Sequence, residues 1–137
     1  GRRRMDRELD SALLARIQRI PIVATLRLQI VRFGDGFCET QVPRSLKYDG
    51  VFDSFHGGLL MTIADSTACF AILTRTGPDT RLTTTDMNIR FLAPCLTDVT
   101  AQATVIKFGR TLCPVAVDLF DQAGRQVAVA QVTYMLL

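Results

Sequence analysis

The stretch from His56 to Leu73 constrains the fold more than any other part of this chain. Its residues are apolar on nearly every side, which is the pattern of a helix buried almost all round. The few polar residues share one narrow stripe because they follow one another at i, i+3, i+4 and i+7. They are Thr62, Asp65, Ser66 and Cys69. Asp65 is the only charged group in the stretch. A helix of this kind needs a surrounding layer to bury it.

The residues on both sides of this helix supply such a layer. Apolar side chains alternate from Val23 onward, Asp35-Gly36 predicts a turn, and a second strand follows at Phe37–Val42. After the helix, the same alternation predicts four more strands, at Leu82–Phe91, Val99–Phe108, Thr111–Phe120 and Val127–Met135. Two strands, a buried helix and four antiparallel strands form an α+β pattern, in which one six-stranded sheet wraps the central helix.

The N-terminal part follows a different pattern. Residues 6–20 carry apolar side chains at helical spacing, so we expect an amphipathic surface helix that Pro21 ends. We expect residues 1–5 to be a disordered basic tip or an artificial leader, and residues 6–137 to form a single domain. No secretory signal is expected, since acidic residues follow the first cations at once.

Charge and composition exclude several classes of function. The chain has 16 Lys and Arg against 13 Asp and Glu, and the surplus lies in Arg2, Arg3 and Arg4, so the remaining body is neutral. A nucleic-acid partner is not expected, because phosphate-backbone binding needs clustered cations. The longest uncharged apolar run has about 8 residues, below the ~20 that span a bilayer, so we expect no membrane partner. The hydrophobic fraction of 48% indicates a large core or a buried interface.

The cysteines show no metal-binding or redox pattern. Cys38, Cys69, Cys95 and Cys113 are 31, 26 and 18 residues apart, and the chain has a single histidine. Without a CxxC pair, this spacing argues against a zinc site and against a thioredoxin-like motif. We therefore expect reduced, buried cysteines in a cytoplasmic protein that uses no metal and no other cofactor.

Asp65 and Gly57-Gly58 are the residues best suited to chemistry. A carboxylate on an apolar helix must be paired or reach a water-filled cleft; a structural aspartate, bonded to a strand backbone or to Arg90, stays open. Gly57-Gly58 stands where the helix begins, so free N–H groups and the positive end of the helix dipole meet there. This is the outline of an oxyanion site, although two glycines also suit a plain turn. Together, a carboxylate and helix-start donors favour acyl transfer or hydrolysis.

Three ordered blocks carry a resemblance to a known family. They are HGGLLMTIADS at residues 56–66, TTDMNIRFLAP at residues 84–94 and KFGRTL at residues 107–112. In this order they resemble the hotdog-fold acyl-CoA thioesterases of the phenylacetic-acid-degradation (PaaI-like) and thioesterase-superfamily-member-2 type. The resemblance covers nearly the whole chain from residue 22 onward. It implies a hotdog fold, a homodimer joined edge to edge with active sites between its chains, and a dimer of dimers, that is, a homotetramer.

The resemblance also implies roles for single residues. Asp65 would be the nucleophile or general base, and the N–H of Gly57 from the other subunit would polarise the thioester carbonyl. His56 would contribute to loop geometry or to substrate contact. Thr84 matches a position where some members place a hydroxyl that positions water. One departure stands out: Gly50 occupies a position where many relatives carry asparagine, and acidic Asp49 and Asp53 flank it.

Substrate contacts are expected on both the helix and the loops. Coenzyme A carries phosphates, so its site needs a few cations at the mouth. We expect these to be Lys107 and Arg110, with Arg90 or Arg75 behind them. The other expected contact residues are Gly58, Ser66 and Cys69, which lie at the start of the helix and on its polar stripe.

The sequence thus predicts an acyl-CoA thioesterase that hydrolyses its substrate to the free acid and coenzyme A, with the coenzyme A thioester as substrate rather than cofactor. Two alternatives remain. One is a non-catalytic acyl-CoA-binding hotdog protein. The other is a hotdog enoyl-CoA hydratase or dehydratase, which would need a histidine facing the carboxylate, whereas His56 lies in the glycine turn.

Overall fold

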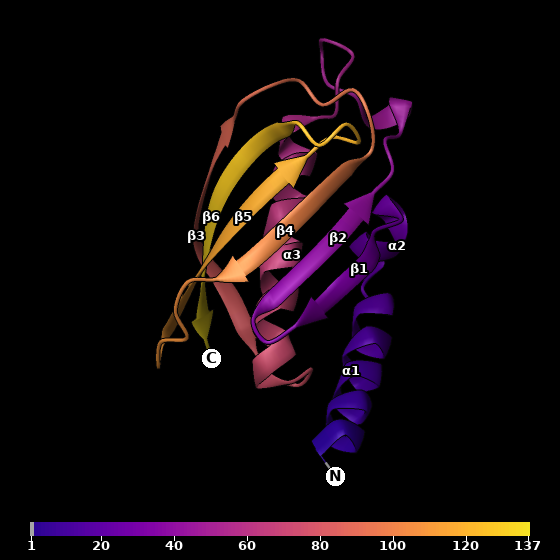
Figure 1. The fold of residues 1–137 in the computed structure, drawn as a ribbon. Coiled ribbons are helices and arrows are strands. Elements are labelled where there is room, and N and C mark those ends of the chain that lie inside the picture. Colours follow the sequence, from indigo (N-terminus) through magenta and orange to yellow (C-terminus); the bar gives the residue numbers. More distant parts are fainter. Residues whose placement is uncertain (1) are drawn as a thin grey trace.

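A single antiparallel sheet curves around one long helix in this chain (Figure 1). The computed structural model describes the backbone of residues 2–137 and the side chains from residue 10 onward. Within them, the strands form one sheet in the order β1-β2-β4-β5-β6-β3. The strands are β1 (Gln29–Gly34), β2 (Phe37–Val42), β3 (Leu82–Phe91), β4 (Val99–Val105), β5 (Leu112–Phe120) and β6 (Gln126–Leu136). The helices are α1 (Arg2–Gln18), α2 (Pro21–Leu26), α3 (Gly57–Thr76) and a short 3₁₀ helix, η1 (Leu46–Tyr48).

This arrangement confirms the predicted α+β pattern. β3 has the predicted bounds, and the hairpin at Asp35-Gly36 joins β1 to β2. β4 ends at Val105, three residues early, and the other late strands shift by one residue at their ends. β1 and β3 form the two edges of the sheet, so the backbone groups on their outer sides are free to pair with another chain.

The prediction of a strand from Val23 is wrong. Residues 21–26 form α2, and β1 begins only at Gln29. Pro21 occupies the start of α2, where a missing N–H costs nothing, and Val23 and Leu26 bury the same face of the helix. Arg27 ends α2 in the left-handed region, at φ 54°. Apolar residues alternate over this segment as they do in a strand, which is why the sequence pattern predicted the wrong element.

The N-terminal helix is longer than predicted. α1 begins at Arg2, not at residue 6, and ends at Gln18, before Pro21. Leu13 and Ile17 are buried in the core, which confirms an amphipathic surface helix. Gly1 lies outside the described residues, and the division at residue 5 stays a prediction.

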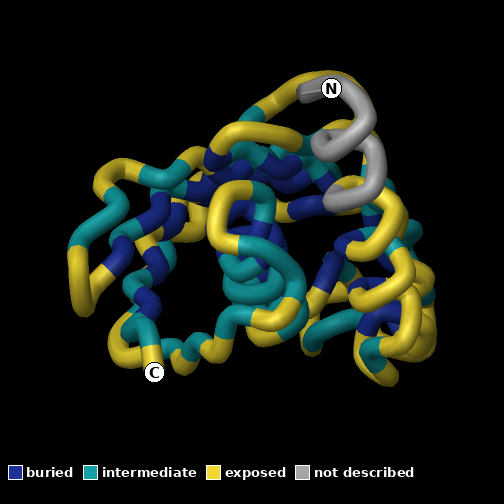
Figure 2. Tube along the Cα trace, turned by 90° about the horizontal axis from the view of Figure 1, so that it is seen from below, coloured by how far each residue is buried: buried dark blue, intermediate teal, exposed yellow. Residues whose placement is uncertain are grey.

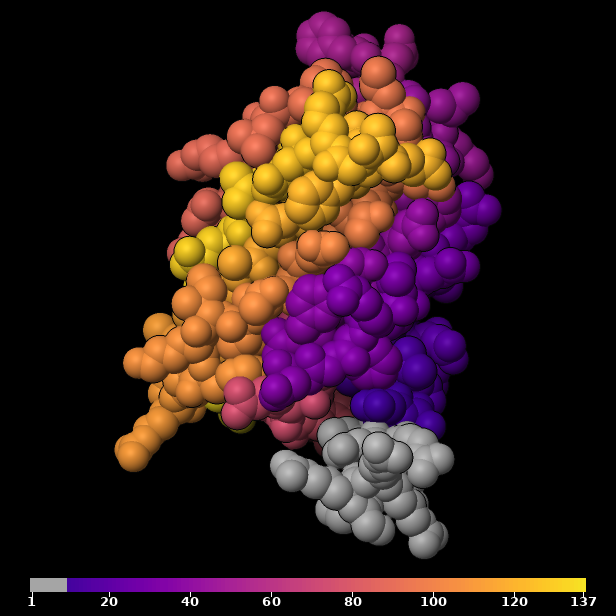
Figure 3. Space-filling model, viewed as in Figure 1, coloured from indigo at the N-terminus to yellow at the C-terminus, as the bar shows by residue number. Residues whose placement is uncertain are grey.

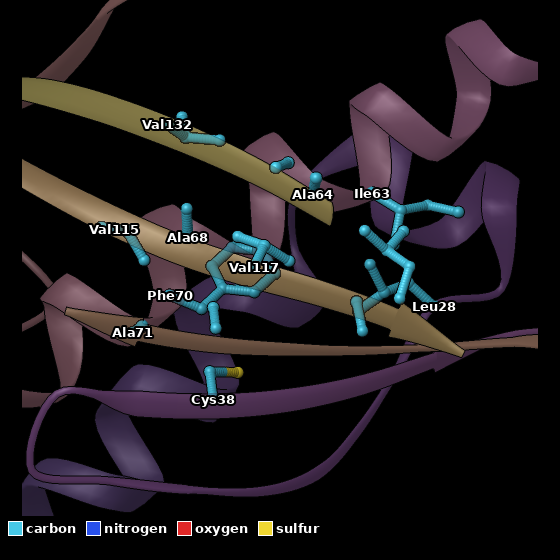
Figure 4. Close-up of a cluster of buried hydrophobic side chains, with 14 of the residues drawn as sticks. Leu28, Cys38, Ile63, Ala64, Ala68, Phe70, Ala71, Val115, Val117 and Val132 are labelled. Atoms are coloured by element: carbon cyan, nitrogen blue, oxygen red, sulfur yellow. The ribbon is translucent and has the colours of Figure 1, made fainter. Parts of the chain in front are cut away.

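The core lies between α3 and the concave face of the sheet. Small side chains on one face of α3 let the helix approach the strands closely; they are Ala64, Ala68 and Ala71. Figure 4 shows them facing Val115 and Val117 of β5 and Val132 of β6. The view from below shows the sheet curving around α3 (Figure 2). The fold therefore has two layers, the sheet and α3, and the core lies between them.

By length and composition alone, α3 is apolar enough to cross a membrane. Its most apolar 18-residue window has a mean hydropathy of 1.4, and half of that window is buried inside the protein. Counting uninterrupted apolar runs missed this property, because Asp65 and the threonines interrupt the runs. The surrounding sheet accounts for the apolar composition, as expected of a core helix.

Candidate active site

Asp65 lies at mid-length on α3, with one carboxylate oxygen held by two hydroxyl groups. The Thr84 hydroxyl donates to Oδ1 at 2.7 Å, and the Tyr134 hydroxyl lies 2.7 Å from the same oxygen. The Tyr134 hydroxyl is also 2.8 Å from the backbone oxygen of Asp65. Oδ2 has no hydrogen-bond partner among the described residues. The two donors therefore fix the plane of the carboxylate and leave Oδ2 free of hydrogen bonds within the described part of the chain.

Both donors reach Asp65 because of a β-bulge in β3. Thr84 is directly opposite Tyr134 of β6, and the register shifts between Thr84 and Asp86, which leaves Thr85 as the extra residue. The bulge lets Thr84 face inward before it and Met87 after it, whereas strict alternation would turn one of them to solvent. Of the three adjacent threonines, Thr84 is the one that bonds Asp65.

Tyr134 is the site residue that the sequence analysis missed. It is 6% exposed and continues the inward stripe of β6 after Ala130 and Val132. The signal was available, since Tyr134 is the only residue of that stripe with a hydroxyl. Burial raises the pKa of Tyr134 well above its usual range, so the hydroxyl stays protonated and remains a donor.

Cys69 and Ser66 follow Asp65 on the same stripe of α3, and both are half-buried. Burial, together with the nearby charge of Asp65, raises the pKa of Cys69 to about 11. The thiol therefore stays protonated at neutral pH and does not act as a thiolate nucleophile. Of the residues on the predicted stripe, Asp65 is the one that carries a carboxyl group.

His56 caps the start of α3. The N–H of Gly58 donates to His56 Nδ1 at 2.9 Å, and the N–H groups of Leu59 and Leu60 donate to the His56 backbone oxygen. Among the described residues, none accepts a hydrogen bond from the N–H of Gly57. This geometry separates the two glycines: Gly58 is used within the chain, and Gly57 presents the free donor at the positive end of the helix.

Gly57 also lacks room for a side chain. A Cβ at this position would lie 3.0 Å from Cζ of Phe91 on β3. The ring covers one side of the turn, which leaves the N–H of Gly57 as the polar feature there. Arg90, the neighbour of Phe91, is exposed and makes no bond to Asp65, so the alternative of an Asp65–Arg90 pair is wrong.

The structure does not bring Gly57 and Asp65 of one chain together. Eight residues separate them on α3, which corresponds to about 12 Å along a helix axis. An atom held at the Gly57 N–H is therefore out of reach of Asp65 in the same chain.

The predicted phosphate-binding cations lie elsewhere. Lys107 and Arg110 are exposed on the loop between β4 and β5. In that loop, Phe108 packs against Arg75, whose guanidinium carbon lies 4.0 Å from the ring centre. Arg75 is in the last turn of α3, so this loop is at the opposite end of α3 from Gly57 (Figure 1).

The described residues contain no group of three or more His, Cys, Asp or Glu side chains close enough to hold a metal ion. A cavity of about 400 Å³ opens between α2, η1 and the start of α3. Phe55 and Leu59 line it beside the His56 turn, but Asp65, Thr84 and Tyr134 do not.

A six-stranded antiparallel sheet that wraps one long apolar helix is the architecture of the hotdog fold. The family model described as the thioesterase superfamily matches residues 52–128. Acyl-coenzyme A thioesterase 13 of Homo sapiens is 32% identical over 100 residues, which cover 69% of this chain and 68% of that protein.

Solved structures show the same fold. The PaaI protein of E. coli, from the phenylacetic acid degradation operon, superposes with a TM-score of 0.87 at 19% identity and covers 96% of this chain and 95% of its own. A thioesterase family protein from Silicibacter pomeroyi has a TM-score of 0.86 at 24% identity, over 94% and 98% of the two chains. The chain belongs to the thioesterase superfamily, and it is a PaaI-like hotdog-fold thioester hydrolase.

Proposed function

We propose that this chain hydrolyses acyl-CoA thioesters to the free acid and coenzyme A, with Asp65 as the reacting carboxylate. The observation that carries the proposal is the geometry of Asp65. Two hydroxyls hold Oδ1, which leaves Oδ2 free on the only acidic side chain of a buried helix. Human acyl-coenzyme A thioesterase 13, which this chain resembles, supports coenzyme A thioesters as the substrate class.

Oδ2 acts in one of two ways in this mechanism. As a general base, it takes a proton from water while the water oxygen bonds to the acyl carbon, and the carbon–sulfur bond then breaks to release the thiol. As a nucleophile, it bonds to the acyl carbon itself, and the carbon–sulfur bond breaks so that coenzyme A leaves as a thiolate and takes a proton from solvent. Water then cleaves the resulting anhydride, which gives the free acid and restores the carboxylate. Only the nucleophilic route forms an acyl-enzyme, which acid quench and mass spectrometry detect during the first turnover.

The N–H of Gly57 stabilises the negative charge that develops on the carbonyl oxygen. Since Gly57 is about 12 Å along α3 from Asp65, we propose that Gly57 of the partner subunit completes each site. The free edge at β3 gives a second chain a place to pair. One donor of this kind contributes about 3–4 kcal/mol of transition-state stabilisation.

We further propose that two such dimers form a homotetramer and that the protein works in the cytoplasm. The exposed apolar residues at the end of β3, Phe91 and Leu92, support burial against another chain. All four cysteines are free thiols, in keeping with a reducing compartment. Lys107 and Arg110 lie at the opposite end of α3 from Gly57 of their own chain, and they are proposed as phosphate contacts at the mouth of the site that a partner subunit completes. Ser66 is proposed as a contact near the thioester.

Thiol release from a panel of aryl, short-chain and long-chain acyl-CoAs tests the proposal. Asp65→Asn keeps the size of the side chain and is expected to lower kcat about 100-fold or more. Asp79→Asn is the matched control, since Asp79 is exposed beyond the end of α3, and it is expected to behave as the wild type. Full activity in Asp65→Asn would refute the role of Asp65.

The same panel separates the alternatives. Tight acyl-CoA binding without thiol release favours a non-catalytic binding protein. A change in enoyl-CoA absorbance without thiol release favours a hydratase or dehydratase. The position of His56 argues against the latter, because its Nδ1 is bonded to Gly58 and its ring lies at the far end of α3 from Asp65.

A further inference from the structure

The loop that leads into the Gly57 turn is held by one arginine. In this segment, called here the Asp49–Phe55 loop, Phe55 is buried in the core but the tip is not. Val51 and Phe52 at its tip are 90% and 89% exposed, and the segment projects from the end of the molecule (Figure 3). Burial of apolar side chains therefore does little to order the tip, and its order must come from polar contacts.

Arg44, which follows β2, supplies those contacts. Its Nε and Nη2 bond both oxygens of Asp49, at 3.1 and 2.5 Å. Nη2 also donates to the backbone oxygen of Asp53 at 2.7 Å, and Nη1 donates to that of Leu96 at 2.7 Å. One guanidinium thus joins the beginning of the loop, its far side and the segment after β3. Such a fork-shaped set of bonds fixes direction as well as distance.

The pair is sheltered enough to hold this arrangement. The side chains of Arg44 and Asp49 are 19% and 11% exposed. The Arg44 guanidinium holds the pKa of Asp49 below its usual range, so Asp49 stays ionised at neutral pH. The backbone N–H of Arg44 donates to Asp98 at 2.8 Å, which anchors the arginine to the segment just before β4. The acidic residue beside Gly50, unexplained in the sequence, is therefore half of a clamp.

The clamped loop runs directly into the oxyanion donor. Gly50 N–H donates to the Ser54 oxygen at 2.9 Å, and Phe55 N–H donates to the Cys95 oxygen at 2.8 Å. His56 then caps α3, and Gly57 follows with its free N–H. A small rotation of the loop would turn the peptide plane between His56 and Gly57, and therefore the direction of that N–H.

We propose that Arg44 is a positioning residue of the thioester site: by clamping the Asp49–Phe55 loop, it fixes the direction in which Gly57 presents its N–H. The proposal rests on the proposed function, because the N–H of Gly57 matters only if a carbonyl oxygen binds there. Arg44 itself touches no reacting atom. Its loss therefore acts on the rate through the geometry of Gly57, and misplacement of a positioned group by about 1 Å is sufficient to slow a reaction strongly.

Two measurements on the full chain test this role. The first is amide hydrogen exchange of Gly50 and Phe55, and the second is kcat and KM for acyl-CoA hydrolysis. In Arg44→Met we expect exchange of both amides to be at least about tenfold faster. We expect kcat to be about tenfold lower, with KM within about threefold of the wild type. In Arg44→Lys, which keeps the charge but not the fork, both effects should be intermediate.

The matched control is Arg32→Met. Arg32 pairs with Glu39 at 3.3 Å between β1 and β2, and its side chain is 65% exposed, so neither measurement should change. Asp49→Asn should reproduce the effect of Arg44→Met, and the double variant should add little to either, since both substitutions break the same contact. Such non-additivity distinguishes a clamp from two unrelated losses of stability.

The outcomes separate the two proposals. Unchanged exchange of Gly50 and Phe55 in Arg44→Met overturns the clamp, and faster exchange with an unchanged kcat overturns the positioning role of Arg44. If the wild type hydrolyses no acyl-CoA, the proposed function fails, and the role of Arg44 in catalysis fails with it. The exchange rates then still decide whether Arg44 orders the loop. If Arg44→Met does not fold, Arg44→Lys and Asp49→Asn give the same comparison.

Discussion

Removing the hydroxyl of Tyr134 should slow the reaction without unfolding the protein. In Tyr134→Phe, Oδ1 of Asp65 loses one of its two donors, each 2.7 Å away, and keeps Thr84. A hydrogen bond to a charged group contributes about 1.5–3 kcal/mol. Because Thr84 still holds the carboxylate, we expect the lower figure, which corresponds to a fall in kcat of about tenfold.

The structural cost should be smaller than the catalytic one. The ring of Tyr134 remains in place, and the Asp65 backbone oxygen that its hydroxyl contacts lies within α3. We therefore expect the free energy of unfolding to fall by about 1 kcal/mol in urea titrations. Tyr48→Phe is the control, since Tyr48 is 41% exposed; it should change neither kcat nor stability.

A double-mutant cycle sharpens this test. Tyr134→Phe and Thr84→Val remove the two donors to one oxygen, so the second removal should cost more than the first. We expect a coupling of about 0.5 kcal/mol or more in kcat, measured by thiol release. In an Asp65→Asn background, Tyr134→Phe should have little further effect. An unchanged kcat in Tyr134→Phe, or an equal fold-loss with and without Asp65, would refute the view that Tyr134 acts through the carboxylate.

Three further predictions follow from the same contacts. Gly57→Pro removes the free N–H at a helix start that tolerates proline, so kcat should fall about 100-fold. Gly57→Ala keeps the N–H and only presses on Phe91, so its kcat should fall less than about fivefold. Equal losses of thiol release in the two variants would contradict the oxyanion role. Burial raises the pKa of Cys69 from 9.0 to about 11, so the folded protein keeps a proton that the unfolded chain releases. The free energy of unfolding should then be unaffected by Cys69 below pH 9 and should decline as the pH rises toward 11. Thermal unfolding at increasing pH should show a shallower decline in Cys69→Ala than in the wild type. An identical decline in the two proteins would count against this linkage. Thr67→Val removes a buried hydrogen bond to Thr40 of 2.8 Å and should lower the free energy of unfolding by about 1–2 kcal/mol in urea, whereas unchanged stability would show that the pair contributes nothing.

Most of the fold could be predicted from local patterns because its elements have clear periods. β3 alternates on either side of its bulge and lies at an edge, and α3 is apolar on nearly every side because the sheet surrounds it. Asp65 stood out for the same reason, as the only acidic residue on a helix that has little contact with solvent. In these elements the sequence pattern and the burial agree.

The errors arose where tertiary packing decided between two local readings. The segment 21–26 alternates well enough for a strand, yet Val23 and Leu26 bury one helical face in the core. A bulge at Thr85 is invisible in a pattern that counts every second residue, and it is what turns Thr84 inward. These features depend on neighbours that are distant in the sequence.

The missed parts of the site are long-range contacts. Tyr134 is 69 residues from Asp65, and Arg44 reaches Leu96 across 52 residues. In the sequence, Tyr134 resembles any aromatic residue at a strand end, and Arg44 any surface cation. Tyr134 meets Asp65 only because β6 packs against α3, and Arg44 meets Leu96 only because the segment after β3 lies beside the Asp49–Phe55 loop.

The central claim is that each site combines Asp65 of one chain with Gly57 of another, and hybrid dimers test it most directly. Asp65→Asn and Gly57→Pro chains, each nearly inactive alone, are mixed under conditions that exchange subunits, and thiol release is followed. A random hybrid pair contains one site with both native groups, so activity should recover to about a quarter of the wild-type value. If subunit exchange is verified by mass spectrometry and no activity returns, Asp65 and Gly57 act within one chain, and the account is wrong.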